Sequence, residues 1–189
     1  AESDYPLAIE YAEKALDANG HNSSACEIMA LAARKSGRTE DARRAVDRLL
    51  EFDPLDHLGR FERYLLEPTA ARLEEFKSMI RNELPHESYL EMAMFYVRTG
   101  CRADAVALLR NAPAQPEVSA WLAYLLKEAA PDESATWLGR AFDASPYLVF
   151  PFREESIPVF EWAAAARPAD WKPKYYLGLI LWAKGRTAA

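Results

Sequence analysis

The sequence is poor in the residues that most often carry chemistry. Its 189 residues include two cysteines, three histidines and seven glycines, several of which stand where helices should end. Cys26 and Cys101 lie far apart and match no metal-ligand spacing. We expect Cys26 to be a small core residue and Cys101 a turn residue, and a reducing compartment fits both.

Catalytic patterns are missing as well. His21, His57 and His86 fall in predicted turns and form no H-x-x-x-H or H-E-x-x-H pattern. Glu74 and Glu75 are adjacent, and adjacent residues of a helix point about 100° apart, so they do not share a site. There is no glycine-rich phosphate loop and no G-x-S-x-G nucleophile elbow. We therefore expect no catalytic residues, no metal and no cofactor in this chain.

Long apolar runs and an excess of positive charge are also lacking. No stretch approaches the roughly 20 apolar residues that cross a bilayer, so we expect no membrane partner. The formal net charge of −6 repels a phosphate backbone and disfavours nucleic acid as a partner. The first five residues, AESDY, are acidic and polar, unlike a secretory signal, and we expect a cytoplasmic protein.

The composition that remains is that of a folded helical protein. Half of the residues are hydrophobic and 28% are charged, which is ordinary for a globular chain and unlike a disordered one. Alanine, leucine, glutamate and arginine are abundant, whereas valine, isoleucine and threonine are few. This balance favours helices over strands, so we predict an all-α protein.

A 34-residue period is the most informative pattern in the chain. Four residues near the amino terminus recur 34 positions later at the same phase: Ala8 as Ala42, Ala12 as Val46, Ala15 as Leu49, and Gly20 as Pro54. Such a period is typical of stacked helix–turn–helix units. These units present interaction surfaces rather than reaction centres.

The period is clearest in residues 23–56. Ser23 or Ser24 is expected to cap a first helix, which Gly37 should end in a left-handed conformation. The apolar face of that helix is Cys26, Met29, Ala30 and Ala33. A second helix should follow Thr39 and end before Pro54.

This unit resembles the tetratricopeptide repeat. Ala30 and Ala42 match the small residues at which helices of that family approach closely, and Pro54 matches the proline that closes each unit. Cys26 and Ala33 stand where the family usually has aromatic residues. The resemblance implies a right-handed superhelical array of antiparallel helix pairs, in which we expect about 11 helices.

We expect one array over residues 1–189 and divide it by its turns and prolines. The parts are a partial unit (1–22), the best repeat (23–56), a degenerate repeat (57–85), two repeats (86–113 and 114–146), an irregular insertion with a helix (147–170) and a truncated repeat (171–189). An unpaired end helix exposes an apolar face. Because both ends cut through a unit, we expect a piece of a longer protein, or ends that another copy covers.

The resemblance also implies where a partner binds, because the first helices of such repeats line a concave face. Their outward positions form the candidate peptide-binding groove: Glu27, Leu31, Arg34, Lys35, Leu90, Met94, Arg98, Ser119, Lys127, Lys172, Tyr175 and Trp182. The apolar members would anchor a peptide, and the cations would pair with its carboxylates. Alternatively, the cations cap helix ends and keep the surface soluble.

Two aromatic segments interrupt the period. We expect the rings of Phe150 and Phe152 to insert between the fourth unit and the next helix, with a binding loop as the alternative. Trp171 before Pro173 indicates the start of a helix, although aromatic residues there can also stack sugars or bases. These two segments, together with the turn at Leu84, resemble parts of the repeat region of a family of large bacterial proteins. In those proteins the repeats join a β-rich domain similar to carbohydrate-active enzymes.

Together these features predict a non-catalytic interaction scaffold that binds a peptide segment or a neighbouring domain on its concave face. The expected partner is a protein, a peptide or an adjacent domain of the same chain. Two alternatives stay open. One is an accessory module of a carbohydrate-active enzyme, and the other is a self-association module that forms a homodimer through its truncated ends.

Overall fold

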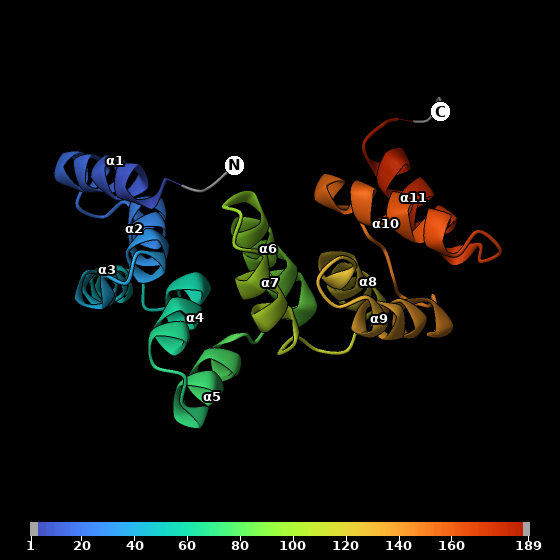
Figure 1. Cartoon of the computed structure of the whole chain (residues 1–189), viewed down its shortest axis with the longest axis horizontal. Coiled ribbons are helices and arrows are strands. Elements are labelled where there is room, and N and C mark those ends of the chain that lie inside the picture. Colours follow the sequence, from blue (N-terminus) through green and yellow to red (C-terminus); the bar gives the residue numbers. More distant parts are fainter. Residues whose placement is uncertain (1–3, 187–189) are drawn as a thin grey trace. The chain divides into compact units, whose positions relative to one another are not determined.

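The computed structural model describes residues 4–186, which form 11 α-helices, one short 3₁₀ helix and no strand (Figure 1). The prediction of an all-α protein with about 11 helices is confirmed. Residues 1–3 and 187–189 of the expected end units lie outside the described residues. The helices group into two compact units, residues 1–83 and 84–189. The single array and its handedness stay predictions.

The first unit contains five helices joined by short turns. They are α1 (Tyr5–Ala18), α2 (Ser23–Lys35), α3 (Thr39–Phe52), α4 (His57–Leu66) and α5 (Ala70–Met79). Helix α2 packs against both α1 and α3, and short turns join it to each of them (Figure 1). This arrangement is the helix–turn–helix stacking that the period predicts.

Alanine residues line the contact between α2 and α3, which we call the alanine seam. Ala30 and Ala33 of α2 and Ala42 of α3 are completely buried, and Val46 is 1% exposed. An alanine side chain is a single methyl group, so the two backbones approach closely without any loss of rotamer freedom. Ala42 and Val46, two residues of the 34-residue period, therefore belong to this seam.

A polar cap and a glycine set the two ends of α2. Asn22, rather than Ser23 or Ser24, caps the helix, and its side chain accepts a hydrogen bond from the Ala25 amide at 3.0 Å. Asparagine is as good a cap as serine, so the helix begins one residue earlier than expected. Gly37 follows the helix with φ +73°, which confirms the predicted left-handed turn.

Aromatic rings form the core of the predicted degenerate repeat, residues 57–85. Phe61 of α4 and Phe76 of α5 are fully buried, and their ring centroids lie 5.1 Å apart. Ile80, just beyond α5, is 8% exposed. Ring packing thus takes the place of the small residues that join α2 and α3.

The second unit contains α6 (Pro85–Arg98), α7 (Arg102–Leu109), α8 (Pro116–Leu126), α9 (Pro131–Asp143), a 3₁₀ helix (Glu154–Ser156), α10 (Ile157–Ala166) and α11 (Lys172–Ala183). They pack as the pairs α6–α7, α8–α9 and α10–α11, and α8 also contacts α10. All of these α-helices except α7 have proline among their first two residues, where a backbone amide lacks a helical acceptor anyway. Among the helices described in either unit, none has the length and apolar character of a membrane span.

Three rings from different helices form the centre of the last pairs. Phe142 of α9, Phe160 of α10 and Tyr176 of α11 are each at most 1% exposed. The Phe160 and Tyr176 centroids lie 5.5 Å apart, and those of Phe142 and Tyr176 lie 6.1 Å apart. Burial raises the pKa of Tyr176 to about 12, so its hydroxyl stays neutral at ordinary pH.

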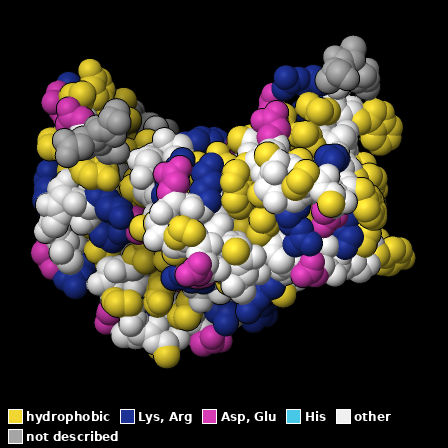
Figure 2. Space-filling view, turned by 45° about the vertical axis from the view of Figure 1, so that its right-hand side comes forward, with side chains coloured by type: hydrophobic (Ala, Val, Ile, Leu, Met, Phe, Trp, Pro, Cys, Tyr) yellow, Lys and Arg dark blue, Asp and Glu magenta, His cyan; other side chains and the backbone are white. Residues whose placement is uncertain are grey.

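The segment between α9 and the 3₁₀ helix differs from the prediction. Phe150 is 64% exposed and Phe152 is 47% exposed, so their rings do not insert between helices. Val149 and Pro151 are buried instead. The physical reason is a turn in which Leu148 takes a left-handed φ of +59°, after which alternate side chains face inward. Figure 2 shows several hydrophobic side chains at the surface of the second unit.

Candidate functional site

The predicted groove residues on α2 are largely engaged within the first unit. Leu31 is 3% exposed and belongs to the core, and Lys35 is half-buried. The Arg34 guanidinium donates from Nε and Nη2 to the two carboxylate oxygens of Glu62 on α4, at 2.7 and 2.8 Å. Glu62 is fully buried. Arg34 therefore forms a bidentate pair that holds α2 against α4, rather than lining an open groove.

Glu27, the acidic member of the predicted groove, lies beside Asp56. The Asp56 side chain caps α4 and accepts a hydrogen bond from the Gly59 amide at 2.5 Å. Burial first, and then the negative charge of Asp56, raise the pKa of Glu27. Glu27 is therefore half of a carboxyl pair inside the unit.

In the second unit the predicted groove residues divide by exposure. Leu90 and Met94 are buried, at 0% and 2% exposure, and so offer no open surface. Arg98, Tyr175 and Trp182 are exposed. Whether these three bind a peptide stays a prediction.

The predicted cations of the second unit have internal contacts. The Arg98 guanidinium pairs with Glu155 at 2.8 Å. Lys127 Nζ lies 3.9 Å from the ring centroid of Tyr124. Lys172 Nζ donates to two carbonyl oxygens at the end of α9, those of Phe142 and Ala144, at 2.6 and 2.7 Å. The Lys172 contact is the helix-capping role that the sequence left open as an alternative.

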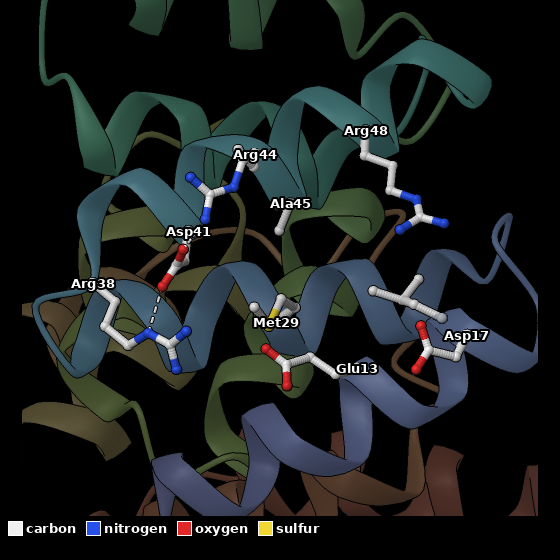
Figure 3. Close-up of a pocket in the computed structure, with 9 residues that line it drawn as sticks. Glu13, Asp17, Met29, Arg38, Asp41, Arg44, Ala45 and Arg48 are labelled. Carbon is white, nitrogen blue, oxygen red and sulfur yellow. Dashed lines mark hydrogen bonds and ion pairs between the residues drawn. The ribbon is translucent and has the colours of Figure 1, made fainter.

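A pocket between α1, α2 and α3 offers a more open site, which we call the α1–α3 pocket. Its volume is ≈420 Å³, and it is lined by Glu13, Leu16, Asp17, Met29, Arg38, Asp41, Arg44, Ala45 and Arg48. In Figure 3, Glu13 and Asp17 extend from α1, whereas Arg44 and Arg48 extend from α3. Met29 lies between these two groups. Carboxylates and guanidinium groups thus face one another across apolar side chains.

The facing charges do not neutralise one another. Asp41 pairs with Arg38 and Arg44 on its own side of the pocket. Arg48 donates from Nε to the carbonyl oxygen of Gly20 at 3.1 Å and has no carboxylate partner in residues 4–186. Glu13 and Asp17 likewise form no ion pair with any described residue. Two carboxylates and one guanidinium therefore remain available to a ligand.

The α1–α3 pocket lies on the other side of α2 from the predicted groove. Met29 follows Glu27 by two residues, and two residues rotate about 200° around a helix of 3.6 residues per turn. Sequence reasoning missed the pocket because it considered first helices alone. The sequence does contain a signal for this pocket, namely like charges one helical turn apart: Glu13 with Asp17, and Arg44 with Arg48. Such pairs destabilise an isolated helix, so their presence suggests a role other than folding.

A buried polar network joins α8 to the 3₁₀ helix in the second unit. The Trp121 indole Nε1 donates to Ser156 Oγ at 3.0 Å, and Ser156 Oγ donates to Glu117 Oε1 at 3.1 Å. Glu117 is 4% exposed, and burial, followed by the charge of Glu87, raises its pKa to about 7. Across the described chain, no group of three or more histidine, cysteine or acidic residues is placed to hold a metal. We assign this network a structural role.

The first three helices carry the sequence similarity of this chain to a known family. Residues 1–60, which include α1, α2 and α3, match the tetratricopeptide repeat family. A solved thermophilic tetratricopeptide-repeat protein of Thermus thermophilus is 21% identical, with 86% of this chain and 90% of that chain covered and a TM-score of 0.42. No curated protein matches the sequence. The family match covers α1, α2 and α3 and the start of α4, and the later helices lie outside it.

Proposed function

We propose that this chain is a non-catalytic docking scaffold that binds an extended protein segment in the α1–α3 pocket. Tetratricopeptide repeats are in general protein-interaction scaffolds and are typically non-catalytic. The observation that carries the proposal is the set of available charges, with Glu13 and Asp17 facing Arg48 across Met29. A scaffold needs such unsatisfied groups on its surface, whereas folding alone does not.

The chemistry of the pocket defines the segment. A lysine or arginine of the segment pairs with the carboxylates of Glu13 and Asp17, and a carboxylate of the segment pairs with Arg48. Between them, an apolar side chain contacts Met29, whose flexible thioether adapts to different shapes. A purely acidic or purely basic segment places like charges against one side of the pocket, which disfavours its binding.

The proposal is tested with three fluorescent peptides of equal length and one central leucine. One peptide carries lysine and glutamate on opposite sides of the leucine, one carries only lysine, and one carries only glutamate. Fluorescence anisotropy with the full chain should show that the mixed peptide binds more tightly than either of the other two. This binding should weaken as salt is added, because the charges are exposed to solvent.

Two variants and one control locate the binding. Asp17→Asn and Arg48→Gln should each weaken the mixed peptide about two- to fivefold, as expected for the loss of an exposed ion pair of ~0.5–1 kcal/mol. Glu10→Gln is the control, because its carboxylate pairs with Lys14 on α1 and does not line the pocket. Equal effects of all three variants, or none from the first two, would refute the proposal.

A second candidate function follows from one exposed aromatic pair. Trp171 is 57% exposed, and its ring centroid lies 5.6 Å from that of Tyr175, which is 41% exposed. Exposed rings of this kind stack against sugar rings, which suits the accessory module of a carbohydrate-active enzyme. Saturable binding of a soluble oligosaccharide that Trp171→Ala abolishes would support this function. Binding that survives the substitution would exclude Trp171 as the site.

A further inference from the structure

The second unit has a pocket of its own, between α7, α8 and α9, which we call the α7–α9 pocket. Its volume is ≈330 Å³, within the range of about 300–1,000 Å³ that is usual for ligand sites. Buried Leu109, Val118 and Leu122 form its apolar base. Trp137 lines it from α9, together with Arg140. The pocket is therefore an apolar hollow next to charged groups.

The Trp137 ring is held in place by a polar pair at its edge. Its indole Nε1 donates to Glu133 Oε1 at 3.1 Å. Both Glu133 oxygens accept hydrogen bonds from Arg110 Nη2 at 2.8 Å. Arg110 also lines the pocket, but its charge is already neutralised by Glu133. The ring thus presents a fixed apolar surface to the hollow.

Arg140 is the cation of this pocket that no carboxylate neutralises. Its guanidinium carbon lies 4.6 Å from the Trp137 ring centroid. The side chain is exposed and forms no ion pair with any residue between 4 and 186. Stacking on an aromatic face orients the guanidinium plane and leaves its N–H edges free to donate. Such an edge matches the two oxygens of a carboxylate.

We infer that the α7–α9 pocket binds a protein segment in which a large apolar side chain stands next to a carboxylate. The apolar side chain enters the hollow between Leu122 and Trp137, and the carboxylate pairs with the free edge of Arg140. Burial of the apolar group supplies most of the affinity, because an exposed ion pair contributes less. The ion pair fixes the direction in which the segment lies.

This inference adds a second site to the proposed docking function and shares with it the premise that the chain binds protein segments. The two pockets differ in chemistry. The α1–α3 pocket selects a segment of mixed charge, whereas the α7–α9 pocket selects an apolar residue beside an acidic one. The net charge of −6 repels acidic segments at a distance, so recognition of the carboxylate depends on Arg140 itself.

The test uses a fluorescent hexapeptide with leucine and glutamate at its centre, and two counterparts. One counterpart replaces the glutamate with glutamine, and the other replaces the leucine with alanine. Anisotropy with the full chain should show the leucine–glutamate peptide binding most tightly, and the alanine counterpart losing at least tenfold. Failure of the leucine–glutamate peptide to saturate at about 1 mM, a very weak affinity, would overturn the inference.

Variants then identify the ion pair. Arg140→Gln should weaken the leucine–glutamate peptide about threefold and leave the glutamine counterpart unchanged. Arg102→Gln is the matched control, because it is an exposed arginine of α7 that does not line the pocket. Ala112→Trp, which places a ring in the pocket lining, should abolish binding of all three peptides while the circular dichroism spectrum stays unchanged. Equal effects of Arg140→Gln on both leucine peptides would overturn the inference.

One further variant separates the two pockets. Asp17→Asn should not change the binding of the leucine–glutamate peptide, because Asp17 lines the other pocket. If it does weaken that peptide, the peptide occupies the α1–α3 pocket and the present inference is wrong. If instead the mixed-charge peptide fails while the leucine–glutamate peptide binds through Arg140, the α1–α3 proposal fails and this inference stands.

Discussion

Replacing Glu117 with glutamine is expected to stabilise the second unit at neutral pH. The carboxyl group is 4% exposed, and its burial raises its pKa from the usual 4.5 to about 7. A difference of about 2.5 pKa units corresponds to ~3 kcal/mol, because each unit is worth about 1.4 kcal/mol. Glu117 is the second residue of α8, where the helix dipole favours a negative charge by about 0.3–1 kcal/mol. The expected net gain is therefore about 2 kcal/mol.

The sign of the effect follows from where the proton is held. Below pH 4.5 the carboxyl group is protonated in the folded and the unfolded chain, so it makes no contribution. Between pH 4.5 and about 7 the unfolded chain releases the proton and the folded chain keeps it, so stability falls as pH rises. Above about 7 the loss is complete. Glutamine keeps Oε1 as the acceptor for Ser156 and cannot ionise.

Tryptophan fluorescence during urea denaturation measures this effect directly. All five tryptophans lie in the second unit, so the signal follows the unit that contains Glu117. The free energies of unfolding of wild type and Glu117→Gln should be similar at pH 4 and should diverge up to about pH 7.5. Glu128→Gln, at an exposed residue beyond α8, is the control and should show no divergence. A gap that does not change with pH, or a less stable variant at pH 8, would refute the reasoning.

Two further predictions concern single residues in each unit. Arg34→Met should lower the free energy of unfolding of the first unit by about 3 kcal/mol, because it removes the bidentate partner of a buried carboxylate. Circular dichroism during urea denaturation measures this loss, and adding Glu62→Gln should recover part of it; an undiminished loss in the double variant would contradict the pairing. Leu148→Gly should be more stable than Leu148→Ala by about 1 kcal/mol, because only glycine adopts a left-handed φ without strain. Denaturation followed by tryptophan fluorescence checks this difference, and equal stabilities would show that the backbone is unstrained there.

The period in the sequence predicted the helices that small residues hold together. Ala30 and Ala42 could be found because close approach of helices requires small side chains at a fixed spacing. Gly37 could be found because glycine adopts a left-handed conformation more easily than residues that carry a Cβ. The cap of α2 was missed by one residue, since Asn22 and Ser23 are equally good caps and only the three-dimensional turn decides between them.

The site residues were harder to predict, because they depend on contacts between distant parts of the chain. The sequence predicted Arg34 to be an outward-facing cation, but in the structure it pairs with Glu62, which lies 28 residues away in the chain. Phe150 and Phe152 were predicted to be buried because phenylalanine is usually a core residue, but both are exposed. The turn at Leu148 decides whether Val149 and Pro151 or Phe150 and Phe152 face the helices. The local sequence does not determine the conformation of that turn. The α1–α3 pocket was missed because its walls are two helices that belong to consecutive repeats.

The alanine seam between α2 and α3 also limits which residues of the first unit can be exchanged. Any larger side chain at Ala30, Ala33 or Ala42 would push the two helices apart, so few substitutions are tolerated there. The outward residues of α1 and α3, such as Glu13 and Arg44, do not contribute to the seam. New binding preferences can therefore be introduced on the outward positions while the helical frame stays the same. The first unit is thus a suitable frame for designed recognition, because the charged residues of the proposed binding pocket are not the residues that hold the helices together.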